Sequence, residues 1–347
     1  MANRLIERFG GAATQLGSSN ETIRLAGLLA MSQLADQWEP HRQACIDVIC
    51  AHARLSCPDA SSELTRRAAV QIVIEHLRPD AQVSWVGARF DLSGIELSDA
   101  DFSNLRLTGG LLSFDKATFV GGGRITFDQT QFAGADVIFR GASIRDDCRL
   151  TFDNARFESG SVSFKQADFG LSTVTFAGAT LGPGCDVDFA EACMYGPAAI
   201  SFSTATVHGS GLHFTGTKFL GQPNGVEADI SFHAAVIDGT LDFTQAEFHR
   251  SVALTDIDWR GGTLLLTAAS LHAGSLSLAG YHGPGATISV QQALPGPGRI
   301  EAPAARAGFF RYVGSENPAL FFGHGPWPYL TLPGPPPTAT PPPAYQN

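Results

Sequence analysis

The chain of 347 residues is long enough for two ordinary domains or for one long repeat array. A hydrophobic fraction of 44% with 38 glycines is typical of a packed protein and excludes a wholly disordered chain. The net charge of −10 falls on residues 86–290, which hold 22 acidic and 12 basic side chains, and such a surface disfavours direct nucleic-acid binding.

Residues 1–80 lack any repeat and are predicted to form an α-helical N-terminal domain that caps the repeat array. Apolar side chains recur there at helical spacing, prolines separate the segments, and Asn20 is placed to cap the second helix. The most apolar stretch, 23–35, is too short and too polar to cross a bilayer, so no membrane span is expected. The four predicted helices span 4–16, 21–36, 41–54 and 61–77.

Residues 86–282 carry a repeat built on phenylalanine. One column of Phe, continued by Leu, recurs every 12 or 13 residues as far as position 214, and a second apolar column follows five residues after each member. A longer step after 214 is assigned to an insertion at 222–229. The two columns hold 19 of the 24 phenylalanines, which chance does not explain. The first column is Phe90, Phe102, Phe114, Phe127, Phe139, Phe152, Phe164, Phe176, Phe189, Phe202, Phe214, Phe232, Phe243, Leu254, Leu266 and Leu278. The second column is Ile95, Leu107, Phe119, Phe132, Ile144, Phe157, Phe169, Leu181, Met194, Val207, Phe219, Ile237, Phe248, Trp259 and Leu271.

A second periodic position lies two residues before each member of a column. It is mostly aliphatic before the first column and small, usually Ala, before the second, as at Ala117, Ala142 and Ala167. A spacing of two places both side chains on the same face of a strand. Each unit is therefore predicted to be two very short strands, with a tight corner between them and a glycine-tolerant corner after them.

These residues resemble the pentapeptide-repeat proteins, as in Phe114-Asp-Lys-Ala-Thr-Phe119 and Phe164-Lys-Gln-Ala-Asp-Phe169. The resemblance implies a mainly β fold, a right-handed parallel (quadrilateral) β-helix solenoid whose small and central apolar residues point inward. The family repeats every five residues, whereas here steps of 5 alternate with steps of 7 or 8. The preferred interpretation is two units, about 25 residues, per four-sided coil, and a flattened coil of one unit remains the alternative. Two units per coil would stack Phe114, Phe139 and Phe164 in one internal ladder.

The flanks complete the predicted organisation. The helical segment contains Glu7-Arg-Phe9, Gln15-Leu-Gly17, Ile23-Arg-Leu25 and Glu75-His-Leu-Arg-Pro79. In these residues it resembles the segment that precedes the repeats in actinobacterial pentapeptide proteins, so a bacterial origin is expected. Residues 284–332 lose the repeat but keep aromatic side chains, and they are interpreted as a C-terminal cap over the last coil. Residues 333–347 are a proline-rich tail that is expected to be disordered or extended.

No catalytic, cofactor-binding or metal-binding residues are predicted. The ten histidines are scattered singly, and His208 and His213 straddle a glycine corner rather than sharing a helix face. Acid pairs such as Asp146-Asp147, Asp186/Asp188 and Asp256/Asp258 are assigned to outward or corner positions as solvated charges, and Gly121-Gly-Gly-Arg124 to a corner. Six cysteines without C-x-x-C spacing are expected to be free, mostly buried thiols in a reducing, cytoplasmic compartment.

The expected function is that of a non-enzymatic scaffold that mediates protein–protein interaction. The alternative is a DNA mimic that binds a topoisomerase such as DNA gyrase, which the resemblance and the acidic middle segment permit. The partner is expected to be another protein, and no oligomeric state is assigned.

Overall fold

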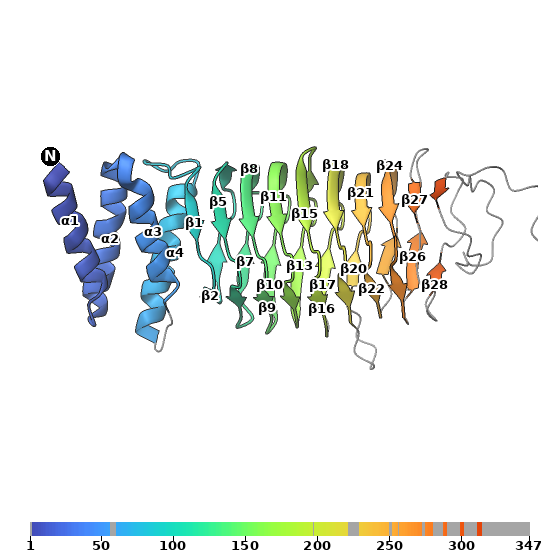
Figure 1. Cartoon of the computed structure of the whole chain (residues 1–347), viewed down its shortest axis with the longest axis horizontal. Coiled ribbons are helices and arrows are strands. Elements are labelled where there is room, and N and C mark those ends of the chain that lie inside the picture. Colours follow the sequence, from blue (N-terminus) through green and yellow to red (C-terminus); the bar gives the residue numbers. More distant parts are fainter. Residues whose placement is uncertain are drawn as a thin grey trace, which may run out of the picture.

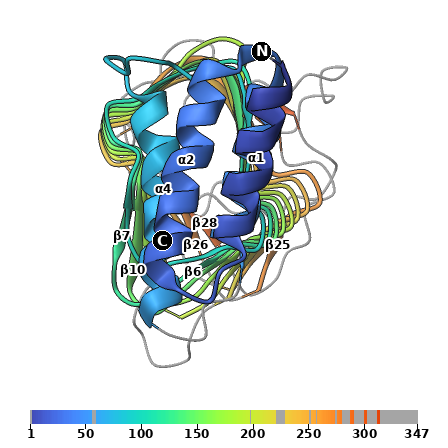
Figure 2. The ribbon, with the colours of Figure 1, turned by 90° about the vertical axis from the view of Figure 1, so that its left-hand side faces the viewer.

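The computed structural model is a parallel β-solenoid with an α-helical segment at its N-terminal end, which confirms the predicted fold class (Figure 1). The coils stack along the long axis of the molecule, and the helices lie at one end of the stack (Figure 2). The structure describes residues 2–55, 60–196, 198–220, 229–249, 252–255, 257–272 and 275–279, together with short strands at 287–289, 299–301 and 311–313.

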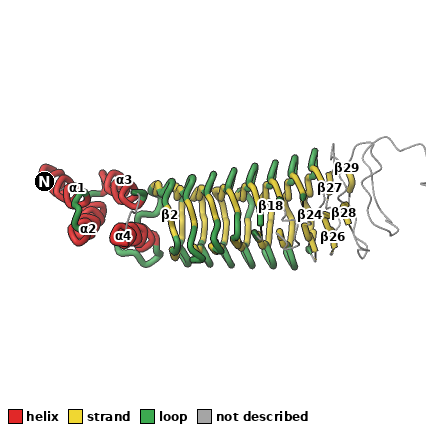
Figure 3. Tube along the Cα trace, turned by 90° about the horizontal axis from the view of Figure 1, so that it is seen from below, coloured by secondary structure: helices red, strands yellow, loops and turns green. Residues whose placement is uncertain are grey.

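The N-terminal segment contains the four predicted helices and one 3₁₀ turn. Asn20 caps the second helix as predicted, because its side-chain oxygen accepts a hydrogen bond from the Ile23 amide at 3.3 Å. Leu28 and Ile49 are fully buried between the helices. The first two helices pack on each other, and the last two lie next to the first coil (Figures 1 and 3). The elements are α1 (Ala2–Leu16), α2 (Glu21–Gln37), η1 (Glu39–His41), α3 (Arg42–Ala53) and α4 (Ala60–Leu77).

Three parallel sheets run along the solenoid. Sheet A contains β1 (Arg89–Asp91), β4 (Arg106–Thr108), β5 (Leu111–Ser113), β8 (Gln131–Ile138), β11 (Arg156–Ser163), β14 (Thr180–Leu181), β15 (Cys185–Asp188), β18 (Thr206–His213), β21 (Val236–Asp242), β24 (Asp258–Leu265), β27 (Thr287–Ser289) and β29 (Arg311–Val313). Sheet B contains β2 (Glu96–Leu97), β6 (Thr118–Phe119), β9 (Ser143–Ile144), β12 (Asp168–Phe169), β16 (Cys193–Met194), β19 (Lys218–Phe219), β22 (Glu247–Phe248) and β25 (Ser270–Leu271). Sheet C contains β3 (Ala100–Asp101), β7 (Arg124–Thr126), β10 (Cys148–Thr151), β13 (Ser172–Thr175), β17 (Ala199–Ser201), β20 (Asp229–Ser231), β23 (Val252–Thr255), β26 (Ser275–Ala279) and β28 (Arg299–Glu301).

Each coil contains two repeat units. Val137, Val162 and Val187 lie in register in sheet A, so successive coils are 25 residues apart. Sheet A receives two strand segments from each coil, since β4 and β5 both pair with β8, and β14 and β15 both pair with β11. Sheets B and C receive one segment each. Four segments per coil decide between the two coil models in favour of two units.

Phenylalanine ladders fill the interior of the solenoid. The predicted ladder is confirmed: Phe114 and Phe139 stack with ring centroids 5.1 Å apart, Phe139 and Phe164 stack at 4.7 Å, and all three side chains are fully buried. A second ladder runs beside the first, and its rings meet those of the first edge-on, as at Phe139 and Phe152 with an interplanar angle of 89°. The members of the second ladder are Phe102, Phe127, Phe152, Phe176, Phe202 and Phe232.

The small residues also point inward, as the two-residue spacing predicted. Ala117, Ala142 and Ala167 are at most 1% exposed. Threonine replaces alanine at 130 and 217, and there its hydroxyl donates to a backbone carbonyl of the coil below, at 2.6 Å from Thr130 to Phe102. A buried hydroxyl in this column is therefore hydrogen-bonded, which removes most of the cost of its burial.

The corners of successive coils stack along the edges of the solenoid (Figure 3). In the tight corner the amide of the small residue donates back to the carbonyl of the preceding Phe, as from Ala142 to Phe139 at 3.0 Å. Where the two segments of sheet A join within one strand, glycine is required by close approach. Gly160 has φ +94°, and a Cβ there would lie 2.2 Å from the Ala135 oxygen of the coil below. The glycine-rich stretches between units therefore reflect coil-to-coil packing.

The first coil departs from the predicted columns. Phe90 lies in register with Leu112 and so occupies the aliphatic position, and Leu97 rather than Ile95 lies in register with Phe119. The assignment of Phe90 and Ile95 to the two columns was therefore wrong by two residues. This coil has helices rather than another coil beneath it, so its side chains are not held to the register of a preceding ladder.

Helical side chains cover the open edge of the first coil. The Gln43 side-chain amide on α3 donates to the Arg89 carbonyl at 2.8 Å and accepts from the Arg89 amide at 3.0 Å, as a neighbouring strand would. From α4, the Arg66 guanidinium donates to the Glu96 carbonyl at 2.7 Å. These contacts satisfy backbone groups that would otherwise form an exposed sheet edge, which is a template for aggregation.

Sheet pairing continues beyond the predicted end of the repeat at 282. Ile288 of β27 pairs with Leu264 of β24, and Tyr312 of β29 pairs with Ile288, each one coil-length further along the chain. The remaining residues of the predicted cap and the tail at 333–347 lie outside the described residues. The predicted insertion at 222–229 also lies outside them apart from Asp229, which begins β20.

Candidate functional site

Outward side chains of sheet B form two columns, one polar and one that mixes polar side chains with Val120, Gly170 and Leu220. Its strands contain only two residues, and consecutive strands are in register, so equivalent side chains from successive coils lie above one another. One column precedes the inward apolar residue of each strand and the other follows it. The first includes Asp168, Cys193, Lys218 and Glu247, and the second includes Arg145, Tyr195, His249 and His272.

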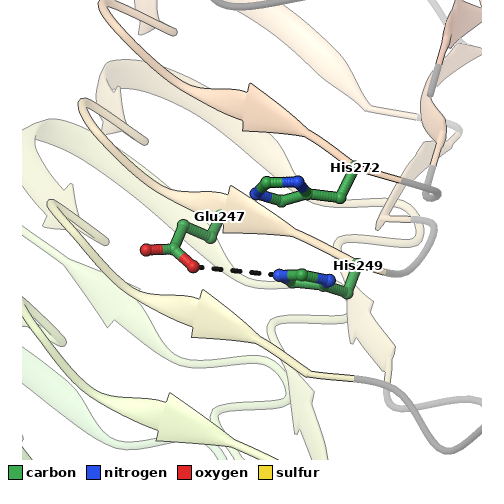
Figure 4. Close-up of side chains that lie close together, drawn as sticks. All are labelled: Glu247, His249 and His272. Atoms are coloured by element: carbon green, nitrogen blue, oxygen red, sulfur yellow. Dashed lines mark ion pairs between the residues drawn. The ribbon is translucent and has the colours of Figure 1, made fainter. Parts of the chain in front are cut away.

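Three of these side chains meet at the C-terminal end of the columns (Figure 4). Glu247, His249 and His272 each offer one nitrogen or oxygen, and these atoms all lie within 4.8 Å of one another. The two imidazole rings stack with centroids 4.2 Å apart and an interplanar angle of 15°. The Glu247 Oε2 atom lies 3.8 Å from His249 Nε2. Both histidines are exposed, and the glutamate is partly buried.

The sequence of β22 and the coil register produce this meeting. Glu247 and His249 flank the inward Phe248 and therefore share the outward face. Leu271 of the next coil pairs with Phe248, and the amide of the following His272 donates to the Phe248 carbonyl at 2.8 Å. The spacing between neighbouring strands, about 4.8 Å, then sets the distance between the two rings.

Lys218 orients the carboxylate of this cluster. Its Nζ atom lies 3.3 Å from Glu247 Oε1, and the second carboxylate oxygen, Oε2, is the one that faces His249. Lys218 comes from β19, one coil before Glu247, in direct register. Two imidazoles and an oriented carboxylate are a donor set that binds borderline divalent metals such as Zn²⁺.

Another histidine, His213, lies between two carboxylates on the outer face of sheet A. His213 Nε2 is 3.6 Å from Asp186 Oδ1, and His213 Nδ1 is 3.7 Å from Asp242 Oδ2. The neighbouring Asp242 carboxylate raises the pKa of His213 above its ordinary 6.5, although burial acts in the opposite direction. Burial favours a higher pKa for Asp242, but the nearby His213 and hydrogen bonds from Thr244 and Thr215 dominate and lower the pKa to about 2.

We expect this arrangement to make stability depend on pH. Because the pKa of His213 is raised in the folded state, its stabilisation is complete below pH 6.5 and is lost as pH rises through the folded value. The stabilisation from Asp242 is complete above pH 3.8 and is lost as pH falls towards 2. The free energies of unfolding of wild type and His213→Gln, measured by urea titration, should therefore differ most between these limits, by on the order of 1 kcal/mol. Parallel pH profiles of the two proteins would contradict this.

Five of the six cysteines are described, and all five are free thiols, as predicted. Burial raises the pKa of Cys45 and Cys148 to about 11, and that of Cys50 and Cys185 to about 12. These four thiols are therefore poor nucleophiles and poor metal ligands at neutral pH. Only Cys193 is partly exposed among the described thiols, and its pKa is also raised by burial. Cys57 lies outside the described residues.

Among the described residues, the acid pairs, the glycine corner and the two histidines considered in the sequence analysis lie at several positions on the outer surface. Asp146 and Asp147 lie at an exposed corner, and Asp186 and Asp188 project outward from β15, as predicted. Asp258 is on the outer side of β24, and Asp256 lies outside the described residues. Gly121 and Gly122 form a corner with φ +82° and +64°. His208 and His213 lie on one strand, β18, and His208 Nδ1 is 2.9 Å from Asp238 Oδ2.

Sequence reasoning missed the cluster at Glu247, His249 and His272. It treated the histidines as isolated, since the two that meet are 23 residues apart in the chain. The signal that could have found them is that each directly follows a member of the second column, Phe248 or Leu271. Two such positions become neighbours only when two repeat units make one coil.

Comparisons with known proteins assign the chain to no family. No protein-family model matches the chain, and no curated protein is similar enough to count as a relative. A parallel solenoid with coils about 25 residues apart is consistent with a repeat β-helix. Among the helices that the structure describes, none combines the length and apolar character needed to cross a bilayer.

Proposed function

We propose that this protein is a non-enzymatic scaffold of the pentapeptide-repeat type, whose outer surface binds another protein. The observation that carries the proposal is the filled interior: the two phenylalanine ladders and the alanine column are buried and packed against each other along the described coils. Binding and catalytic sites for small molecules are concave and largely apolar. A solenoid whose interior is packed in this way presents outer faces of stacked parallel strands, and such faces suit recognition by another macromolecule.

Backbone pairing between coils holds the outer faces in a fixed arrangement, and cross-coil ion pairs lie on top of it. The Arg140 guanidinium pairs with Asp115 of the preceding coil at 2.8 Å, and Lys165 pairs with Glu191 of the following coil at 3.4 Å. A preorganised surface reduces the ordering cost of association. The unpaired, buried thiols also fit a reducing, cytoplasmic location.

Two exposed apolar groups let an experiment distinguish the binding surfaces. Ile6 on α1 and Leu29 on α2 are 56% and 58% exposed, whereas Leu171 and Tyr195 are exposed on the solenoid. Quantitative affinity capture from the native host would compare wild type with the pairs Ile6→Ser/Leu29→Ser and Leu171→Ser/Tyr195→Ser. We expect one protein to be retained in stoichiometric amount and to be lost with one pair only, with circular dichroism unchanged. If no protein is retained in stoichiometric amount, or if the purified chain turns over a substrate, the scaffold proposal is contradicted.

DNA mimicry is the second candidate, favoured by the net negative charge of residues 86–290. Mimicry needs a regular row of uncompensated carboxylates, because the basic groove of the partner reads phosphates at fixed spacing. Here Asp115, Glu191 and Glu247 are paired with cations from neighbouring coils. The chain also has no Asp or Glu for 35 residues between Glu191 and Glu227, which is more than one coil.

We therefore expect the purified protein not to inhibit DNA supercoiling by gyrase at low salt. Low salt is the sensitive condition, because it lengthens the range of any electrostatic attraction between the acidic faces and the enzyme. A supercoiling assay over a range of protein concentrations measures this directly. Inhibition at micromolar concentration that fades as salt rises would make the mimic the better description.

A further inference from the structure

We propose that Glu247, His249 and His272 bind one Zn²⁺ ion on the outer face of sheet B. The proposal does not depend on the scaffold function. It rests on three donor atoms from two consecutive coils that lie within 4.8 Å of one another on one face of the solenoid. Zinc sites with two histidines, one glutamate and a further open position are an established coordination type.

The donors need only a small adjustment to reach an ion. Tetrahedral Zn²⁺ with bonds of about 2.0–2.1 Å places neighbouring donors about 3.3 Å apart. The stacked rings of His249 and His272 must tilt towards each other, since parallel rings direct their lone pairs along parallel lines. Both rings are exposed, so side-chain rotation can supply this tilt without moving the backbone.

The third donor is already held in position. Lys218 contacts Glu247 Oε1 at 3.3 Å, which leaves Oε2 directed at the histidines. An outer contact of this kind orients a ligand of a metal site. Lys218 forms an ion pair with the carboxylate and is not itself one of the three donors.

Two other histidine–carboxylate contacts on the described part of the solenoid, at His208 and His213, pair an imidazole with carboxylates alone. His213 lies between Asp186 and Asp242, and the Asp242 carboxylate already accepts hydrogen bonds from Thr215 and Thr244. His208 has a single carboxylate partner, Asp238, at 2.9 Å. His208 is therefore a matched control, because it combines an exposed imidazole and a carboxylate from the next coil without a second ring.

A bound ion would cross-link two coils. Glu247 and His249 belong to the coil of β22, and His272 belongs to the coil of β25. Those strands pair through only two residues in each, so a shared ligand would stabilise their pairing near the C-terminal end of the array. Binding to the folded state alone raises the unfolding temperature by mass action.

The test is isothermal titration of the full chain, reduced and without a histidine tag, with ZnCl₂. We expect one ion per chain, and the variants His249→Gln, His272→Gln and Glu247→Gln should each weaken binding by about tenfold or more. The variants His208→Gln and Cys193→Ser should bind as wild type does, and Lys218→Ala should weaken binding without abolishing it. Co²⁺ in place of Zn²⁺ should give the visible absorption of a tetrahedral site with nitrogen and oxygen ligands.

Circular dichroism of each variant keeps the outcome interpretable, since all the replaced side chains lie on the outer surface. Three results would overturn the proposal: no binding by the wild type, equal binding by the cluster variants, or loss of binding in Cys193→Ser alone. The last result would place the ion at a thiol two coils away from His249. A rise in unfolding temperature with Zn²⁺ that persists in His249→Gln/His272→Gln would count against the site in the same way.

Discussion

Replacing Phe139 by Ala is expected to lower the free energy of unfolding by about 3–5 kcal/mol. The side chain is fully buried in the middle of the first ladder, with Phe114 stacked on one side at 5.1 Å and Phe164 on the other at 4.7 Å. Its edge also meets Phe152 of the second ladder at 6.1 Å. Backbone pairing above and below prevents the coils from closing the cavity, so both the lost burial and the cavity contribute.

Tyr195→Ala is the matched control, because it removes an aromatic ring of similar size from the outer surface. Tyr195 is 41% exposed, and its hydroxyl donates a hydrogen bond to Asp168 Oδ2 at 3.1 Å. Its replacement should cost no more than about 1 kcal/mol. Urea titration followed by far-ultraviolet circular dichroism measures both variants. Equal losses in the two proteins would mean that the ladder is not the core of the solenoid.

Ala167→Leu is expected to destabilise the protein by about 1–3 kcal/mol through overpacking. Ala167 is 1% exposed and stacks in the small-residue column between Ala142 and Ala192 of the adjacent coils. A larger side chain there would press on the rings of Phe164 and Phe169, whose centroids are 5.9 Å apart. Phe164 cannot move away without disturbing its ladder, and Phe169 lies in register between Ile144 and Met194 of the adjacent coils.

The outward neighbour Lys165 provides the comparison. Its side chain is 42% exposed and pairs with Glu191 at the surface. Lys165→Leu should change the free energy of unfolding by less than about 0.5 kcal/mol, because exposed ion pairs contribute little. A loss for Lys165→Leu as large as that for Ala167→Leu in the same titration would reverse the inward and outward assignments.

The sequence by itself determined the solenoid, because every unit repeats the same local choice. In each unit, inward-facing residues lie two positions apart in two short segments, and glycine is tolerated between units. This pattern is compatible with short strands that face one core and with little else. The ladder of Phe114, Phe139 and Phe164 followed from that period. The helices and the cap at Asn20 were predictable for a similar reason, since their signals are local.

Tertiary structure decided what depends on neighbouring coils. The step lengths favoured two units per coil over one. The pairing of both β4 and β5 with β8 decided the matter. The shift at Phe90 and the pairing of Gln43 with Arg89 arise where a helix replaces a coil, and no repeat signal extends to that edge. The meeting of His249 with His272 depends on stacking as well, because residues 23 positions apart become neighbours only when the coil period brings them into register. Local pattern therefore specifies the strand and its inward face, whereas the contacts between outward side chains are created by stacking one coil on the next.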